Sequence, residues 1–190
     1  MNVEGVALET STYSLDPTSG LVRRAKAGDL AAFEEIIRLH EKHVLRIAIR
    51  MLGNLADAQD AAQETLLRLH QQLKSFDDAR EFRPWLSRMT VNVCLDLLRK
   101  RRTVVPIGAI TPPAAKGNPE DLASLEERRR MMTAALAQLP EKQRAAIVLR
   151  DVEGLSTAEV ADALGSSEST VRSQISTARV RLRELLRGNK

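Results

Sequence analysis

The chain contains little cysteine and few aromatic residues, and each shortage excludes a class of protein. One cysteine, Cys94, stands among 190 residues, which excludes an intrachain disulfide and a cysteine-rich zinc site. Aromatic residues make up 3% of the chain whereas hydrophobic residues reach 43%, so any core must consist of Leu, Ala, Ile and Val. That mixture favours helices over sheets.

Long apolar segments are also lacking. No stretch approaches the roughly 20 apolar residues of a membrane span. Residues 1–20 have neither the basic start nor the apolar core of a signal peptide. The chain has no glycine loop of the kind that cradles phosphates. We therefore expect a protein of the reducing cytoplasm, with no membrane insertion and no nucleotide or other cofactor of its own.

Proline is concentrated in one place. Four of the seven prolines, with two glycines, fall in residues 103–121 and break any helical period. The sequence predicts a flexible tail over 1–20, an extended linker over 103–122, and two small all-α domains over 21–102 and 123–190. Both domains are basic, with 16 Lys and Arg against 11 Asp and Glu in the first and 12 against 9 in the second. This balance suits a nucleic-acid partner.

Residues 154–186 predict a helix-turn-helix. Ser156 and Glu159 have the spacing of a capping box, and Gly165 permits the positive φ of a tight turn. The second helix, from about residue 167 to 186, has apolar residues at spacings of three and four and arginines on another face. DNA is therefore the first candidate partner. The alternative is an ordinary surface helix whose arginines are only solvated.

The outer face of the helix predicted over residues 57–73 is acidic and rich in amides, with one apolar residue at its centre. Its members are Asp57, Asp60, Gln63, Glu64, Leu67 and Gln71. Such a surface does not suit DNA, whereas a basic protein partner could bury Leu67 among the carboxylates. The alternative is a solvated face with Leu67 at the margin of the core.

The next helix and the loop before it are of a different kind. Arg88 and Asn92 lie one turn apart, and four consecutive basic residues, 99–102, close the helix. Cations favour a helix C-terminus, but four in a row exceed that need and indicate phosphate contacts. Asn92 either reads a base edge or bonds within its domain. Phe76, in the loop, either fills the core or stacks on an unpaired base.

Metal and catalytic sites are not expected. His40 and His43 are three residues apart, with no third ligand nearby, and Cys94 has no histidine arranged as a base. Two other functions remain open at this point. One is an ordinary two-domain transcription regulator whose first domain senses a ligand, and the other is a small helical enzyme that uses His40, His43 or Cys94.

Three motifs resemble one family. Residues 57–68, Asp-Ala-Gln-Asp-Ala-Ala-Gln-Glu-Thr-Leu-Leu-Arg, resemble region 2.2 of bacterial RNA polymerase sigma factors. Residues 82–86, Phe-Arg-Pro-Trp-Leu, with Asn92 and residues 96–99, resemble the next part of the same domain. Residues 139–144, Leu-Pro-Glu-Lys-Gln-Arg, and the helix-turn-helix are similar to region 4. With only these two domains and a short linker, the chain resembles the extracytoplasmic-function (ECF) class.

The resemblance implies partners and contacts. Region 2.2 would dock on core RNA polymerase, at the β′ clamp helices and with the β subunit also in contact, through Asp57, Asp60, Gln63, Glu64 and Leu67. The minus-ten element would be bound by Phe76, Arg88, Asn92, Arg99, Lys100, Arg101 and Arg102. The minus-thirty-five element would be bound by Ser167, Ser169, Thr170, Arg172, Ser173, Ser176, Arg179 and Arg183.

The resemblance further implies that the polymerase performs the chemistry, so no catalytic residue and no small-molecule substrate are expected. An anti-sigma factor is an expected partner. The two basic domains, held apart by the linker, would grip separate stretches of promoter DNA. Three positions depart from the family pattern: His70 stands where an aromatic residue is usual, Ser166 where an apolar one is, and Gln174 where a basic one is.

Overall fold

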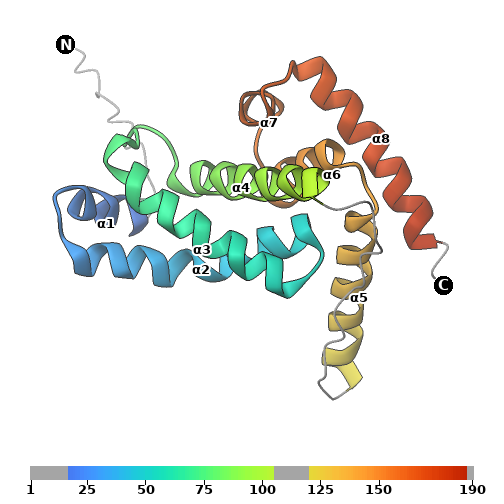
Figure 1. Cartoon of the computed structure of the whole chain (residues 1–190), viewed down its shortest axis with the longest axis horizontal. Helices are drawn as coiled ribbons and strands as arrows, with labels where there is room; N and C mark the ends of the chain where they lie inside the picture. Colours follow the sequence, from blue (N-terminus) through green and yellow to red (C-terminus); the bar gives the residue numbers. More distant parts are fainter. Residues whose placement is uncertain (1–16, 105–119, 188–190) are drawn as a thin grey trace, which may run out of the picture.

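The computed structural model of the protein describes residues 17–104 and 120–187. Within these ranges the chain forms eight α-helices and no strand (Figure 1). The helices are α1 (Pro17–Lys26), α2 (Leu30–Leu52), α3 (Leu55–Gln72), α4 (Phe82–Val104), α5 (Glu120–Ala137), α6 (Glu141–Ile147), α7 (Thr157–Leu164) and α8 (Glu168–Arg187). The all-α prediction is confirmed. We call α1–α4 the first lobe and α5–α8 the second lobe.

Two helix ends differ from the predicted domain limits. Helix α1 begins at Pro17 and so includes the last four residues of the expected tail. Proline suits the first position of a helix, where its fixed φ is helical and no N–H is required. Helix α5 begins at Glu120, inside the expected linker. The remainder of the predicted tail and linker, residues 1–16 and 105–119, lies outside the described residues.

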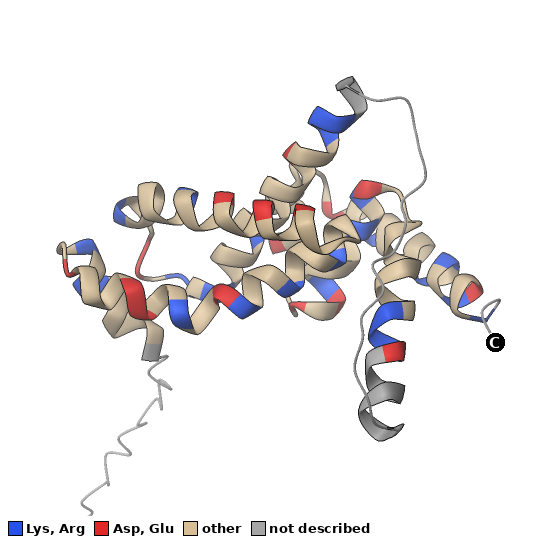
Figure 2. Cartoon of the chain, turned by 60° about the horizontal axis from the view of Figure 1, so that its bottom comes forward, with Lys and Arg blue, Asp and Glu red and all other residues tan. Residues whose placement is uncertain are grey.

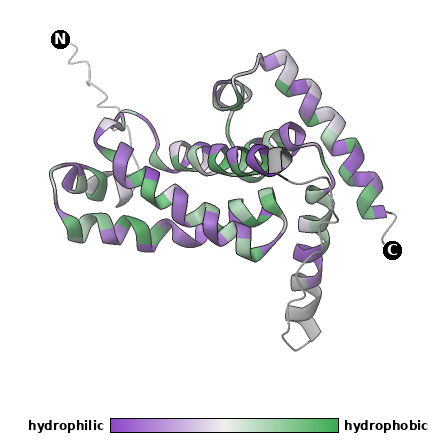
Figure 3. Cartoon of the chain, in the orientation of Figure 1, coloured by the Kyte–Doolittle hydropathy of each residue, from purple (hydrophilic) through white to green (hydrophobic). Residues whose placement is uncertain are grey.

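The first lobe contains a core of its own. Helices α2, α3 and α4 pack side by side and α1 covers α2 (Figure 1). Figure 3 shows apolar segments recurring along α2 and α3, as amphipathic helices require. The cluster that they enclose consists of Val22, Ile36, Val44, Leu69, Leu73, Phe76, Phe82, Leu86 and Met89. Phe33 and Trp85 pack against it, so every described Phe and Trp belongs to this one cluster.

A second cluster joins the two lobes. Its members come from α2, α3 and α4 in the first lobe and from α5, α6, α7 and α8 in the second, and they include Met51, Val91, Cys94, Leu136 and Val148. None of its buried members is aromatic. Helix α4 contacts α2 and α3 on one side and α6 and α7 on the other. The expectation that the lobes are held apart is therefore wrong for this structure, because both lobes contribute residues to one core. We call their contact the seam.

Arg144 of α6 stabilises the seam from within. Its side chain is buried and donates hydrogen bonds to the carbonyl oxygens of Ala137, at 2.6 Å, and of Leu139, at 2.9 Å. It also donates to the carbonyl of Met51, in the last turn of α2. The last carbonyls of a helix have no partner within the helix. One guanidinium thus satisfies carbonyls at the ends of α2 and α5, one in each lobe.

Candidate docking and nucleic-acid interfaces

The outer face of α3 is exposed around Leu67. The helix buries Ala58, Ala61, Thr65 and Leu69, whose spacing places them on one stripe. Leu67 lies away from that stripe and is 60% exposed. The side chains of Asp60 and Gln63 are exposed with it, and Glu64 accepts a bond from Arg68 Nε at 2.7 Å. The predicted docking residues therefore share one solvent-facing surface, apart from Asp57.

Asp57 belongs to a contact that the sequence did not indicate. Its carboxylate pairs with the guanidinium of Arg101, at the basic end of α4. Arg99 and Lys100 beside it are exposed. Arg102 lies in the part of α4 whose side chains are outside the described residues. The basic end of α4 and the start of the acidic face of α3 are thus neighbours, although 44 residues separate Asp57 from Arg101.

Phe76 does not present its ring to solvent. It is 6% exposed and its ring lies 4.8 Å from that of Trp85 and 5.5 Å from that of Phe82, measured between centroids. The Phe76 ring therefore fills one end of the first lobe's core, below the loop that carries it. The assignment of Phe76 to the minus-ten surface is therefore wrong for this structure, because no face of the ring is open to a base. Asn92, by contrast, is exposed.

The helix-turn-helix forms as the sequence predicts. Ser156 Oγ accepts from the Glu159 amide at 3.2 Å, and Glu159 Oε2 accepts from the Ser156 amide at 2.8 Å, which completes the capping box. Gly165 ends α7 at a φ of 56°, where a side chain would be strained. Ser167 then caps α8 by accepting from the Thr170 amide at 3.2 Å.

The outer face of α8 is exposed along its length. Val171, Ile175 and Ala178 are buried on the opposite side, which fixes the orientation of the helix. The exposed side chains are those of Ser167, Ser169, Thr170, Arg172, Ser173, Ser176, Arg179 and Arg183. All eight predicted minus-thirty-five residues are therefore exposed to solvent, on the sides of α8 that do not face the core.

Two of these arginines pair with carboxylates of the second lobe. Arg172 binds Glu168 at 2.7 Å. Arg179 donates two hydrogen bonds to Asp151, from Nε at 2.9 Å and from Nη2 at 2.6 Å. These bonds raise the pKa of the Arg179 guanidinium. Lys and Arg residues occur on the helices of both lobes, with Asp and Glu among them (Figure 2). The basic surfaces are therefore partly neutralised within the chain.

The seam holds a buried polar cluster that the sequence did not indicate. His43 Nε2 of α2 lies 2.9 Å from Ser87 Oγ of α4 and 3.2 Å from Glu153 Oε2 of the second lobe. Ser87 Oγ donates to the same carboxylate at 3.3 Å, and Arg83 Nη2 lies 3.9 Å from it. Glu153 follows a π-helical turn over Val148–Val152. The amide of Glu153 closes that turn by donating to the Val148 carbonyl at 3.0 Å.

Burial sets the protonation of this cluster. It lowers the pKa of His43 to about 4, an effect that the guanidinium groups of Arg83 and Arg46 increase, so the imidazole is neutral at pH 7. Burial also raises the pKa of Glu153, although the positive charges of Arg83 and Arg50 act to lower it. The Glu153 side chain is only 3% exposed. A carboxylate so deeply buried requires the hydrogen bonds and positive charges that the first lobe supplies.

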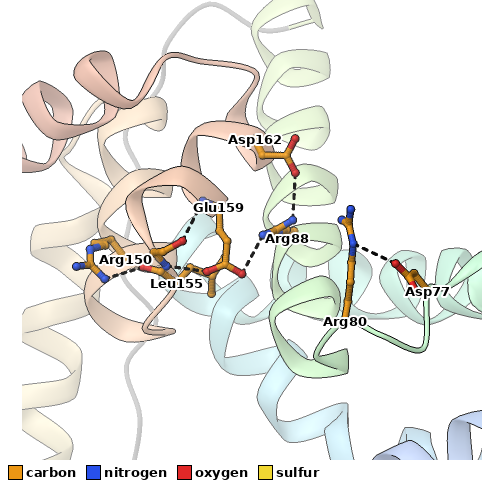
Figure 4. A network of polar contacts seen from close by, with 8 residues as sticks. Asp77, Arg80, Arg88, Arg150, Leu155, Glu159 and Asp162 are labelled. Carbon is orange, nitrogen blue, oxygen red and sulfur yellow. Dashed lines mark hydrogen bonds and ion pairs between the residues drawn. The ribbon is translucent and has the colours of Figure 1, made fainter.

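Arg88 is also bound across the seam. Its Nη2 lies 3.1 Å from Glu159 Oε1 and its Nη1 lies 3.1 Å from Asp162 Oδ2, so one guanidinium of α4 bridges two carboxylates of α7 (Figure 4). The Arg88 side chain is 16% exposed. Next to it a cleft of about 1110 Å³ lies between the lobes, with Trp85 and Pro84 on one side and Leu155 and Ser156 on the other.

The three remaining candidate residues are Cys94, His40 and His43. Cys94 is completely buried in the shared core, and burial raises the pKa of its thiol to about 12. The His40 ring lies 5.1 Å from that of Phe82, while His43 belongs to the seam. Over residues 17–104 and 120–187, no three His, Cys, Asp or Glu side chains are grouped as metal ligands. In the same ranges no helix has the length and hydropathy of a membrane span.

Comparison with known proteins identifies both lobes. Residues 36–104 match the family model of Sigma-70 region 2, and residues 122–182 match that of Sigma-70, region 4. The ECF RNA polymerase sigma factor SigE of Mycolicibacterium smegmatis is 38% identical over 178 residues, which cover 90% of this chain and 68% of SigE. The ECF RNA polymerase sigma factor SigW of Bacillus subtilis is 31% identical, covering 87% of this chain and 95% of SigW.

Solved structures resemble the whole fold. CnrH, solved in complex with the cytosolic domain of CnrY, has a TM-score of 0.66 and 29% identity, over 91% of this chain and 99% of CnrH. The sigma factor RpoE of Bartonella quintana, solved with the anti-sigma factor NepR, also has a TM-score of 0.66, with 28% identity over 83% of this chain and 98% of RpoE.

Proposed function

This chain belongs to the ECF class of RNA polymerase sigma factors, and we propose from that premise which of its surfaces perform each step of initiation. As a sigma factor it binds core RNA polymerase and directs transcription initiation at promoters. The first lobe, which contains region 2, recognises the minus-ten element, and the second lobe, which contains region 4, recognises the minus-thirty-five element. Sigma factors are initiation factors, and RNA synthesis is performed by the polymerase.

The docking surface is the outer face of α3. The observation that supports this assignment is an apolar side chain that is 60% exposed on a helix face that also carries Asp60 and Glu64. Interfaces gain most of their affinity from a central anchor that becomes desolvated, while charged groups at the rim set orientation and association rate. Leu67 is the proposed anchor, and Asp60, Gln63 and Glu64 are the proposed rim. Asp57 joins them once its contact with Arg101 is broken.

The two DNA surfaces are the basic part of α4 and the outer face of α8. On α4 the proposed contacts are Arg88, Asn92 and the basic residues that end the helix. On α8 they are the eight exposed residues from Ser167 to Arg183 described above. The capped N-terminus of α8 presents amide N–H groups and the positive end of the helix dipole, which suit a DNA phosphate. The arginines behind it lie where a recognition helix enters the major groove.

We further propose that an anti-sigma factor regulates this chain, because RpoE of Bartonella quintana is solved with one. Such a factor would have to cover a docking or DNA surface, and the outer face of α3 and the cleft at the seam are both accessible to it.

Reconstitution tests the proposed function. The purified chain is mixed with core RNA polymerase that lacks its own specificity subunit, and the mixture is separated by gel filtration. We expect the chain to elute with the polymerase, and the complex to start transcription of genomic DNA at a small set of positions that share upstream sequences. A chain that elutes alone, yet binds a specific duplex unaided, would instead be an ordinary transcription regulator.

A further inference from the structure

Positive charge gathers around Glu153 at the edge of the seam. Arg46 and Arg50 of α2 are four residues apart and therefore lie on one face of that helix. Arg83 of α4 approaches from another side, with its Nη2 3.9 Å from Glu153 Oε2. The charges of all three guanidinium groups act to lower the pKa of Glu153, which burial raises. Three cations from two helices thus surround one buried carboxylate.

One carboxylate does not neutralise three guanidinium groups. Neither Arg46 nor Arg50 forms an ion pair with a carboxylate of residues 17–104 or 120–187. Glu153 also accepts from Ser87 at 3.3 Å and lies 3.2 Å from His43 Nε2, so its oxygens are shared with polar groups of the first lobe. Like charges held near one another repel, and an anion from outside the chain would relieve that repulsion.

Arg50 lies where this repulsion is greatest. Its side chain is half-buried, and burial lowers the pKa of its guanidinium. The charge of Glu153 opposes this effect, whereas the charges of Arg46 and of Arg129 in α5 lower the pKa further. Electrostatic attraction is stronger at a half-buried position than in open water, because the surroundings screen it less. An anion that reaches Arg50 would therefore be bound more firmly than one at a fully solvated arginine.

The chemistry of the cluster favours phosphate as the anion. The planar fork of donors on a guanidinium matches the oxygens of a phosphate group, which arginine binds through two parallel hydrogen bonds. Arginines on two different helices can bind more than one phosphate group at a time. Arg46 and Arg83 are exposed, whereas Arg50 lies on α2, which contacts α5 and the turn before Glu153. A slender phosphate chain can reach all three side chains more easily than a strand of DNA.

We propose that Arg46, Arg50 and Arg83 form a binding site for a short phosphate chain, supplied either by inorganic polyphosphate or by the triphosphate of a nucleotide. Glu153 lies among the three arginines, and its negative charge limits the affinity of the site. The site is separate from the docking face of α3 and from the outer face of α8. It therefore goes beyond the proposed function, and each can fail without the other.

Calorimetric titration of the full-length chain with sodium tripolyphosphate tests the proposal, at constant ionic strength and without divalent cations. Arg46→Gln removes one donor group from an exposed position, so the variant is expected to fold. We expect its Kd to rise by about tenfold, as loss of one hydrogen bond to a charged group costs. Arg38→Gln is the matched control, because it removes the same charge from an arginine of α2 that already pairs with Glu35. Its Kd should stay close to that of the parent chain.

A variant of Glu153 should change the affinity in the opposite direction. Glu153→Gln removes the negative charge among the arginines but keeps an oxygen that can accept from Ser87. Tripolyphosphate should bind this variant severalfold more tightly than the parent chain. Thermal unfolding of each variant without ligand shows whether it is folded. Equal losses from Arg46→Gln and Arg38→Gln, or weaker binding to a folded Glu153→Gln chain, would overturn the proposal.

Two further titrations identify the source of the phosphate chain and separate it from nucleic acid. ATP that binds as tightly as tripolyphosphate would indicate a nucleotide, whereas weaker binding of ATP would indicate inorganic polyphosphate. A single strand of thymidines should lose no affinity on Arg46→Gln. If the strand loses affinity while tripolyphosphate does not, the arginines belong to a DNA surface and the proposal is wrong. If tripolyphosphate does not bind at all while the chain still binds core polymerase, the phosphate site is wrong and the sigma function stands.

Discussion

Leu67 is exposed because α3 buries the opposite face of the helix. A substitution at Leu67 therefore tests docking without disturbing the core. Leu67→Asp removes apolar area from the centre of the acidic face without touching the core. We expect core polymerase to bind the variant more weakly by about 2 kcal/mol, or roughly 30-fold, as loss of an interface anchor costs. Titration of labelled polymerase measures the affinity. Leu39→Asp, at a 46% exposed position of α2, is the matched control and should leave it unchanged.

Arg179 should affect promoter choice and not polymerase binding. Arg179→Ala removes a proposed major-groove contact and frees Asp151, which lies on the surface. We expect promoter-specific transcription to fall about tenfold, the cost of one base or phosphate contact, with unchanged affinity for core polymerase. Arg181→Ala removes the same charge from a side chain that bonds Gln143 and should have little effect. Parallel losses of transcription and of polymerase binding would indicate misfolding instead.

Individual side chains were predictable where a local pattern defined their environment. The exposure of Leu67 and of the α8 arginines follows from helical spacing alone. The burial of Phe76 does not, because the loop around it is polar and its partners, Phe82 and Trp85, lie beyond that loop in the sequence. From the sequence alone, an aromatic residue in a polar loop could either stack on an unpaired base or fill the core. The structure decides between these alternatives because it shows which residues surround the ring.

At the scale of elements, the turn between α7 and α8 depends on one glycine. Gly165 has a φ of 56°, and a methyl group there would meet no other atom, so backbone strain alone sets the cost of a substitution. We expect Gly165→Ala to lower the free energy of unfolding by about 1 kcal/mol. Thermal unfolding measures this as a fall in Tm of about 3 °C. Gly20→Ala, within α1 and equally uncrowded, should instead raise stability slightly.

The elements themselves were largely predictable because their signals are local. The capping box of Ser156 and Glu159, the glycine turn and the apolar stripe of α8 all act within a few residues, and the structure contains each of them. The start of α1 at Pro17 was missed because its sequence, Pro-Thr-Ser-Gly, is typical of a turn. Packing of α1 on α2 outweighs that local preference.

At the scale of the whole molecule, acid should weaken the folded chain through His43. Its pKa is lowered to about 4 in the fold and returns to the ordinary value of 6.5 on unfolding. Unfolding therefore takes up a proton between these values, and stability that is complete above pH 6.5 is lost as the pH falls toward 4. At pH 5.5 the loss due to His43 is about 1 kcal/mol. Glu153, whose pKa is raised, acts in the opposite direction.

Comparison with a variant isolates the contribution of His43. His43→Gln keeps a polar group near Ser87 and cannot take up the proton. Urea unfolding of both chains at pH 7.5 and pH 5.5 gives the change in stability for each. We expect the loss on acidification to be smaller in the variant by about 1 kcal/mol, because the Glu153 contribution is common to both. Identical losses would mean that His43 is not buried as a neutral imidazole.

The seam is the part of the molecule that the sequence could not predict. Arg88 and Asp162 are separated by 74 residues, and Ser87 and Glu153 by 66. Neither pair carries a local signal, because arginine, serine and carboxylate side chains on helices and turns are ordinary surface features. The sequence predicted the apolar stripes of α2 and α4. Residue spacing does not indicate, however, that the second lobe covers one end of these stripes.

The separation of aromatic from aliphatic residues limits how strongly the lobes adhere. Phe76, Phe82 and Trp85 are confined to the cluster inside the first lobe, whereas the buried residues of the shared core are small or aliphatic. Aromatic rings contribute the largest contact area per residue. The contact between the lobes therefore depends on the fit of many small and aliphatic side chains. Exchanges that conserve volume are expected to be tolerated there, whereas an aromatic ring would overpack the core.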